Sequence, residues 1–245
     1  MSSQTGTLFG IGVGPGDPEL VTLKASKILS RVDMVFAAAS TRNHHSLAKD
    51  IARPHVPPAT PIKMLKFPMT RDKNETHEAW EMHARTIIDQ LETGKDVAVI
   101  TLGDAMTYST YGYIVRYISA MAPHLKIETI PGISSYQAAA ARLNTPLVEG
   151  EESLMVVSGA KGGNRLRALS RKPENVVFLK AYRNIKDITD ALTENGCYQQ
   201  CVGIKNCGHE NEEIIPNIEE LYKQTPNYWT LIIAKKKKED GPPKG

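Results

Sequence analysis

The sequence lacks the features that mark membrane-bound and secreted proteins. It contains no apolar run of the roughly 20 residues that a transmembrane helix needs. Residues 1–6, MSSQTG, carry neither the basic segment nor the apolar segment of a signal peptide. We therefore expect a cytoplasmic protein that does not bind a membrane.

Cysteine is also scarce, and its pattern argues against disulfides and metal. The chain has only 3 cysteines, Cys197, Cys201 and Cys207, and an odd number cannot pair completely. Together with His209 they could be drawn as a metal site, but their spacing matches no pair of zinc knuckles. We interpret them as reduced thiols and expect no metal site.

The excess of positive charge is small and lies at one end of the chain. The formal net charge is +3, and Lys235–Lys238 precede a tail that contains glycine and proline. A nucleic-acid interface would combine basic and aromatic residues on a folded face. We expect no nucleic-acid partner, and a disordered basic tail from about residue 236.

Apolar runs alternate with helical patterns over the first part of the chain. This alternation is typical of a parallel sheet with crossover helices, and so of an α/β domain. The predicted strands span residues 8–13, 34–38, 62–67, 97–102 and 127–130. The predicted helices span residues 20–29, 79–91 and 111–121, and a fourth begins at residue 134 or 135.

A second α/β domain is predicted after the turn-rich segment 144–150. Its short successive strands favour a mixed sheet, with strands at 154–158, 176–179, 202–205, 213–215 and 229–234. Its helices are predicted at 164–169, 185–194 and 218–223. We expect domains at residues 1–147 and 148–245, with an active site in the cleft between them.

The glycine-rich turn at residues 10–16, GIGVGPG, follows the first predicted strand. Glycine lets the backbone approach a ligand closely and adopt a positive φ. The turn differs from a dinucleotide fingerprint because Pro15 lacks an N–H, and because residues 34–36 place no acidic side chain at the ribose position. The turn is therefore predicted to bind a ligand other than NAD.

Four segments together resemble one family. They are GIGVGPGDPELVTLK at 10–24, TLGDAMTYST at 101–110, PGISS at 131–135 and YWTLII at 228–233. In this order and spacing they are similar to the tetrapyrrole methylases, the class III S-adenosylmethionine-dependent methyltransferases, over about residues 7–234. The first three segments follow the first, fourth and fifth strands, so we expect them to meet at one rim of the sheet.

The resemblance implies S-adenosylmethionine as methyl donor and S-adenosylhomocysteine as product. It assigns cofactor contacts to Pro15, Leu102, Gly103, Asp104, Thr107, Ser134 and Ser135, and in the second domain to Lys180, Cys207 and Thr230. Family members often carry methionine and glycine where this chain has Lys180 and Cys207. Asp104 is the candidate catalytic residue, and we favour a positioning role because an ordinary aspartate is too weak a base to abstract a proton.

Within the family, residues 103–110 and 67–70 are similar to the subgroup that methylates C20 of precorrin-2. Ala105, where the common variant has proline, favours the cobalt-containing substrate, cobalt-factor II. This substrate is a polycarboxylate, so its site should contain cations and polar groups. The candidates are Arg42, Asn43, His44, Lys66 and Arg71.

Two alternative functions remain open, and so does the oligomeric state. The chain could be another tetrapyrrole methylase, acting on uroporphyrinogen III or diphthamide, or a noncatalytic carrier of a tetrapyrrole or cobalt. The segment 103–110 favours an enzyme, since a carrier has no need of it. The resemblance also implies a homodimer, and Trp80, Tyr111, Tyr113 and Tyr117 are candidate interface residues.

Overall fold

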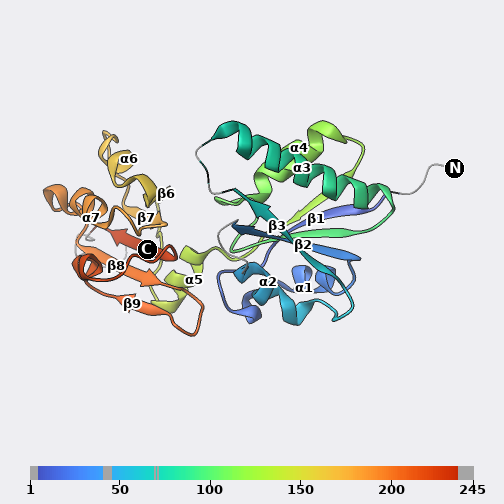
Figure 1. The fold of residues 1–245 in the computed structure, drawn as a ribbon. Helices are drawn as coiled ribbons and strands as arrows, with labels where there is room; N and C mark the ends of the chain where they lie inside the picture. The colour runs from blue at the N-terminus through green and yellow to red at the C-terminus, as the bar shows by residue number, and fades with distance from the viewer. Residues whose placement is uncertain (1–4, 41–45, 69, 71, 237–245) are drawn as a thin grey trace. The chain divides into compact units, whose positions relative to one another are not determined.

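The computed structural model describes residues 5–40, 46–68, 70 and 72–236. The chain divides into two compact units, residues 1–134 and 135–245, and each is an α/β structure with its own sheet (Figure 1). The predicted fold class is therefore confirmed. Among the described residues, no helix has the length and apolar character to span a membrane.

The first unit contains a five-stranded parallel sheet. Its strands are β1 (Thr7–Gly12), β2 (Met34–Ser40), β3 (Ile62–Phe67), β4 (Val97–Thr101) and β5 (Lys126–Ile130). Their order in the sheet is β3-β2-β4-β1-β5, and every neighbouring pair is parallel. Because the strands are parallel, the carboxyl ends of β1, β4 and β5 lie side by side at one rim.

Helices cover both faces of this sheet (Figure 1). They are α1 (Leu23–Leu29) and α2 (Leu47–Ala52) on one face, and α3 (Lys73–Glu92) and α4 (Tyr111–Met121) on the other. The alternation of side chains along β1 explains the two layers. Ile11 packs in the core that includes α1 and α2, whereas Leu8 packs in the core that includes α3 and α4.

The predicted helix at 20–29 is wrong in its first part, and α2 was not predicted. A single 3-10 turn, Pro18–Leu20, precedes α1. The chain is then extended at Val21 and Thr22, and the Thr22 hydroxyl caps α1 by accepting from the Ala25 N–H at 3.2 Å. This break separates the 3-10 turn from α1, although the apolar residues of both follow a single helical pattern in the sequence.

The second unit contains a mixed sheet, as predicted. Its strands are β6 (Leu154–Ser158), β7 (Asn175–Leu179), β8 (Gln200–Lys205), β9 (Glu213–Ile215) and β10 (Thr230–Lys235), in the order β6-β7-β10-β8-β9. β6 and β7 are parallel, while β10 is antiparallel to β7 and to β8. The segment Ile218–Lys223, predicted to be helical, is a 3-10 helix.

The helices of the second unit explain where the two units divide. They are α5 (Ser135–Arg142), α6 (Asn164–Arg167) and α7 (Ile185–Thr193). Ala139 of α5 packs with Val177 and Ile204 of the second sheet. The division therefore comes after Ser134, earlier than the expected boundary after residue 147, because α5 belongs to the second core.

Candidate functional site

The glycine-rich turn after β1 is joined to the loop after β4 by backbone hydrogen bonds. Gly14 and Gly103 form an antiparallel bridge. The Gly103 N–H donates to the Gly14 carbonyl at 2.7 Å, and the Gly14 N–H donates to the Gly103 carbonyl at 3.2 Å. The first two sequence motifs are therefore held together at the rim of the first sheet.

Asp104 links the same loop to the segment after β5. Its Oδ1 accepts from the Met106 N–H at 2.9 Å and from the Thr107 hydroxyl at 3.0 Å. Its Oδ2 accepts from the Gly132 N–H at 3.1 Å. The predicted convergence of the three motifs at one rim is thus confirmed, and both oxygens of Asp104 are occupied in maintaining it.

Gly12 and Gly132 allow the three segments to meet at backbone distance. A Cβ atom on Gly12 would lie 2.6 Å from the Gly103 carbonyl oxygen, and one on Gly132 would lie 2.3 Å from the same oxygen. Neither distance is sterically possible without a shift of the backbone. Both glycines were seen within motifs but not predicted as site residues, and their residue type was the available signal.

Gly103 differs from these two because a Cβ atom there would not collide with the neighbouring segments. Its φ is +69°, and a Cβ there would come no closer than 4.0 Å to any atom outside its chain neighbours. Gly103 is itself buried. Leu102 and Thr107, which are near it in the sequence, are half-buried, as is Ser135, while Pro15 and Ser134 are buried. The rim therefore brings together backbone groups and side-chain hydroxyls that can donate and accept hydrogen bonds.

Tyr111, at the start of α4, packs against β1 and helps to fix the loop that follows β4. A Cβ on Gly10 would lie 1.9 Å from the Tyr111 ring, so the glycine in β1 makes room for it. The Tyr111 hydroxyl forms a 3.1 Å hydrogen bond with the Thr129 hydroxyl, and burial raises the pKa of the phenol. The Tyr111 N–H donates to the Ser109 hydroxyl at 3.1 Å. These contacts fix the end of the segment that contains Gly103.

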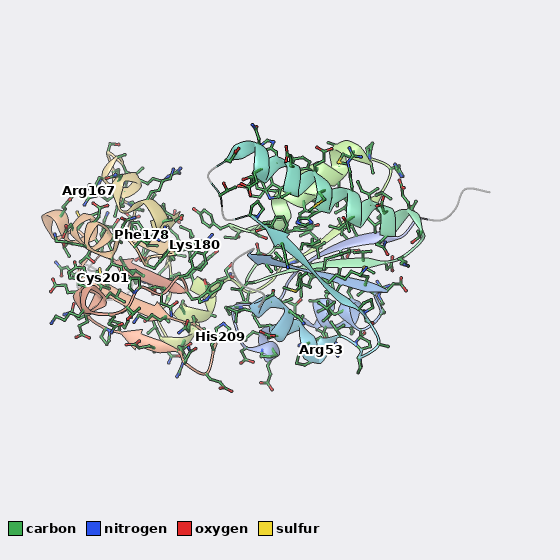
Figure 2. All side chains as sticks on the ribbon, viewed as in Figure 1. Arg53, Arg167, Phe178, Lys180, Cys201 and His209 are labelled. Atoms are coloured by element: carbon green, nitrogen blue, oxygen red, sulfur yellow. The ribbon has the colours of Figure 1, made fainter. Side chains whose placement is uncertain are left out.

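The predicted residues of the second unit lie where three neighbouring strands of its sheet begin or end, and we call this side of the sheet its edge. Lys180 follows β7, Cys207 follows β8, and Thr230 begins β10, and these strands are neighbours in the order β7-β10-β8. Figure 2 marks Lys180 near this edge. The Ala181 N–H donates to the Thr230 carbonyl at 2.9 Å, so a backbone hydrogen bond joins the segment after β7 to the start of β10.

Only one of these three side chains is accessible. Thr230 is 1% exposed and its hydroxyl donates to the Asn227 carbonyl at 2.6 Å. Cys207 is buried, and burial raises the pKa of its thiol to about 12, so the thiol stays protonated at neutral pH. Lys180 is half-buried and adopts a φ of +57°.

The candidate substrate residues are only partly described. Lys66 is exposed on β3, and its carbonyl accepts from His83 Nε2 at 2.8 Å. Arg42, Asn43, His44 and Arg71 lie outside the described residues, as does the tail after residue 236.

The cysteines do not come together. Cys197 and Cys201 pack against the core that includes α7, whereas Cys207 belongs to the core that includes α5, on the other face of the sheet. Across the part of the chain that the structure describes, no group of three His, Cys, Asp or Glu side chains could hold a metal ion.

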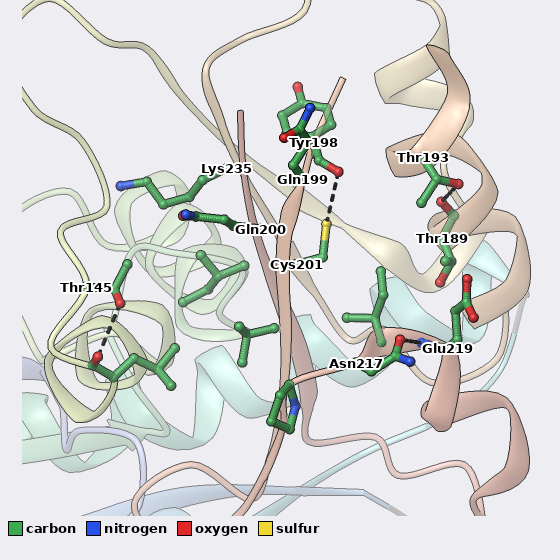
Figure 3. Close-up of a pocket in the computed structure, with 15 residues that line it drawn as sticks. Thr145, Thr189, Thr193, Tyr198, Gln199, Gln200, Cys201, Asn217, Glu219 and Lys235 are labelled. Carbon is green, nitrogen blue, oxygen red and sulfur yellow. Dashed lines mark hydrogen bonds between the residues drawn. The ribbon is translucent and has the colours of Figure 1, made fainter. Parts of the chain in front are cut away.

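A separate pocket of about 580 Å³ lies within the second unit (Figure 3). Its lining includes Thr189, Gln200, Cys201 and Lys235, and it contains none of the predicted site residues. The Thr189 hydroxyl is buried and has no hydrogen-bond partner among the residues that the structure describes. The pocket is therefore not part of the rim described above.

Comparison with known proteins identifies the family. The family model for Tetrapyrrole (Corrin/Porphyrin) Methylases matches residues 7–222, which is most of the chain. The chain belongs to this family. The tetrapyrrole methylase resemblance expected from the four segments is thus confirmed, and with it the expectation of an enzyme.

Several relatives are similar over nearly their whole length. Cobalt-precorrin-2 C(20)-methyltransferase of Salmonella typhimurium is 29% identical, covering 94% of this chain and 97% of the relative. The probable cobalt-precorrin-2 C(20)-methyltransferase of Methanocaldococcus jannaschii is 31% identical, covering 94% and 96%. Precorrin-2 C(20)-methyltransferase of a Sinorhizobium species is 28% identical, covering 94% and 95%.

Solved structures of other methylases share the fold. Cobalt precorrin-4 methyltransferase CbiF has a TM-score of 0.69 at 19% identity, with 94% of each chain covered. Uroporphyrin-III C-methyl transferase from Thermus thermophilus, complexed with S-adenyl homocysteine, has a TM-score of 0.66 at 22% identity, covering 94% of this chain and 92% of that one.

Proposed function

We propose that this tetrapyrrole methylase transfers a methyl group from S-adenosylmethionine to C20 of precorrin-2 or cobalt-factor II, in cobalamin biosynthesis. The observation that carries the proposal is the rim of the first unit, where Gly14, Gly103 and Gly132 meet and a Cβ atom on Gly103 would not collide with the neighbouring segments. The three relatives named for C(20) methylation, at 28%, 29% and 31% identity, support the position of transfer.

The chemistry asks the chain mainly to bind and orient. Bound S-adenosylmethionine would supply a methyl group attached to a sulfonium sulfur, and this sulfur would leave as a neutral thioether without the help of an acid catalyst. The backbone at Gly103 and the hydroxyls of Thr107 and Ser135 would hold the cofactor, and the hydrogen bonds of Asp104 would maintain the geometry of the rim. Alignment and exclusion of water can supply most of the rate enhancement of such a displacement.

The assignment of Lys180, Cys207 and Thr230 to the cofactor stays a prediction. Cys207 and Thr230 are buried, so their contribution would come from backbone groups at the edge of the second sheet. Single substitutions in the two units, each followed by a cofactor titration, would show which set contributes.

S-adenosylmethionine is expected to bind with a Kd in the micromolar range, about −8 kcal/mol. The reason is the convergence of backbone and hydroxyl groups around Gly103. Isothermal calorimetry measures the Kd directly, and NAD serves as the control ligand because the Pro15 turn lacks a dinucleotide fingerprint. No heat and no thermal shift at millimolar S-adenosylmethionine would contradict the proposal.

The substrate is tested by an assay with precorrin-2, cobalt-factor II and uroporphyrinogen III in parallel. From one of the first two we expect a product in which a methyl group has replaced a hydrogen, which is lost from the macrocycle as a proton, and NMR should locate that methyl group at C20. Methylation of uroporphyrinogen III alone would favour another activity within the family. Tight tetrapyrrole binding without consumption of S-adenosylmethionine would favour a carrier.

We also propose that the chain forms a homodimer through the outer surface of α3 and α4. Trp80 of α3 stacks on Tyr113 of α4 with ring centroids 4.2 Å apart, and Arg116 lies 4.8 Å above Tyr113. Tyr113 is 40% exposed, whereas Tyr111 is buried in the core. Among the candidate interface residues, Tyr113 is exposed and Trp80 and Tyr117 are half-buried, so these three are the available aromatic anchors.

Sedimentation equilibrium is expected to give a mass twice the 27.0 kDa of the chain at micromolar concentration. Tyr113→Asp should dissociate the dimer, because it places a charge among the stacked aromatic side chains. Leu23→Asp is the matched control, since Leu23 is 71% exposed on α1, on the other face of the sheet. A wild-type mass of 27.0 kDa would show that the chain is a monomer.

A further inference from the structure

Aromatic and cationic side chains gather at the edge of the second sheet where β7 ends and β10 begins. We call this set the aromatic–cation edge; it consists of Lys180, Tyr182, Arg183, Tyr228 and Trp229. The rings of Tyr182 and Tyr228 lie edge to face at 5.3 Å, and those of Tyr228 and Trp229 at 4.9 Å. The three rings therefore form one continuous cluster from two separate segments of the chain.

Both cations of the edge contact aromatic rings, and neither contacts an acidic side chain among the described residues. The Lys180 ammonium lies 5.6 Å from the Tyr228 ring centroid, and the Arg183 guanidinium lies 5.1 Å from that of Tyr182. Within the described residues, neither forms an ion pair with a carboxylate. A cation over a ring face keeps N–H donors for a further partner.

Lys186, on α7 of the same unit, differs from Lys180 and Arg183 because it forms an ion pair. Its ammonium pairs with Asp190 at 3.1 Å, and this pair is one turn of helix apart. Its charge is therefore already matched by an acid. The edge carries two positive charges that the described part of the chain leaves without an anion.

The backbone beneath the edge is fixed in an uncommon conformation. Lys180 has a φ of +57° and Asn206, at the end of β8, a φ of +49°. Asn227 Nδ2 donates to Asn206 Oδ1 at 3.0 Å, and Asn227 Oδ1 accepts from the Trp229 N–H at 2.8 Å. Non-glycine residues with positive φ cost free energy and occur disproportionately at functional sites.

The aromatic members of the edge are accessible despite their size. Tyr228 is 39% exposed and Trp229 is 41% exposed. Neither is therefore explained as core packing. Exposed rings beside two unmatched cations form a surface suited to a ligand that combines an extended apolar ring system with several anionic groups.

We propose that the aromatic–cation edge binds the tetrapyrrole substrate, with Lys180 and Arg183 contacting its peripheral carboxylates and Tyr228 and Trp229 packing against the macrocycle. The identity of the ligand rests on the proposed function. The inference reassigns Lys180 from the cofactor, which the resemblance implied, to the substrate. Two cations match a polycarboxylate, whereas the methionine part of S-adenosylmethionine offers one carboxylate.

The test measures binding of uroporphyrin III, a stable polycarboxylated tetrapyrrole, by its absorbance change on titration with the full chain. Lys180→Met and Arg183→Gln should each weaken binding about three- to tenfold, because each removes one charge-assisted contact. Lys180→Met keeps an unbranched side chain at the same φ, so it changes charge with little change in backbone strain. Lys186→Met is the matched control and should leave the affinity unchanged.

A second titration with S-adenosylhomocysteine separates substrate from cofactor. We expect its Kd to be the same in wild type and Lys180→Met. If instead Lys180→Met weakens S-adenosylhomocysteine and not uroporphyrin III, Lys180 serves the cofactor and the inference is overturned. Equal weakening by Lys180→Met and Lys186→Met would also overturn it, because only overall charge would then matter.

Failure of the proposed function would look different. In that case the wild-type chain would not bind S-adenosylhomocysteine and would methylate no tetrapyrrole, whereas the uroporphyrin III titration would still report on the edge. Wild-type binding of uroporphyrin III that neither variant weakens would overturn the inference while leaving the methyltransferase proposal intact. Absence of any wild-type uroporphyrin III binding would overturn the inference as well.

Discussion

Gly103→Val is expected to weaken S-adenosylmethionine binding by at least about a hundredfold, close to 2.7 kcal/mol, while the chain stays folded. A Cβ at residue 103 would lie 4.0 Å from the Ile133 carbonyl oxygen and the Ser134 Cα, which is ordinary van der Waals distance, and no described atom outside the chain neighbours would be nearer. The protein itself therefore does not resist the side chain by collision. The ligand does, because the valine would fill the space that lets it approach the backbone of the rim.

The backbone strain of this substitution needs its own control. Gly103 has a φ of +69°, where a β-branched residue is unfavourable whatever the space. Gly150 has a φ of +54°, and a Cβ there would also meet no atom within 4 Å, but it lies in a turn of the second unit. Gly150→Val should therefore lower Tm by a similar amount and leave cofactor binding intact.

Calorimetry with S-adenosylhomocysteine and a thermal melt on both variants decide the matter. Loss of binding in Gly103→Val alone places the ligand at the rim. Unchanged affinity in a folded Gly103→Val would show that the cofactor binds elsewhere. Equal loss in both variants would indicate that strain, and not occupied space, causes the effect.

The rim could be predicted from sequence because its signals are local. Glycine and proline are concentrated in the turn at residues 10–16, and β1 and β4, which precede the first two motifs, are short buried runs with clear ends. Once the strands are taken as parallel, their carboxyl ends must share one edge of the sheet. The backbone bridge from Gly14 to Gly103 is the physical form of that expectation.

Other features depend on contacts between distant segments, which periodicity does not report. The division after Ser134 follows from packing of α5 on Val177 and Ile204, and no change of composition marks it. The aromatic–cation edge forms because β7 and β10 are neighbours, although Lys180 and Tyr228 are far apart in sequence. Neither segment's sequence indicates that β7 and β10 are neighbours in the sheet.

Asp104→Ala is expected to reduce methyl transfer by at least about a hundredfold, and Asp104→Asn by about tenfold. The carboxylate accepts three hydrogen bonds that join the loop after β4 to itself and to Gly132. Each bond to a charged group contributes roughly 1.5–3 kcal/mol, and alanine removes all three acceptors. The rim would then lose the geometry in which Gly103 is presented.

Asparagine separates positioning from proton transfer, because it keeps the shape of the side chain and removes its charge. Its carbonyl oxygen can still accept from the Met106 N–H and the Thr107 hydroxyl, but its amide would face the Gly132 N–H, which is also a donor. One contact of three is lost, so a modest fall in both S-adenosylhomocysteine affinity and turnover is expected. Asp89→Asn, at an exposed position of α3, is the control and should change neither quantity. If Asp104→Asn abolishes turnover while the Kd for S-adenosylhomocysteine is unchanged, the carboxylate handles a proton of the substrate and its role is not positioning.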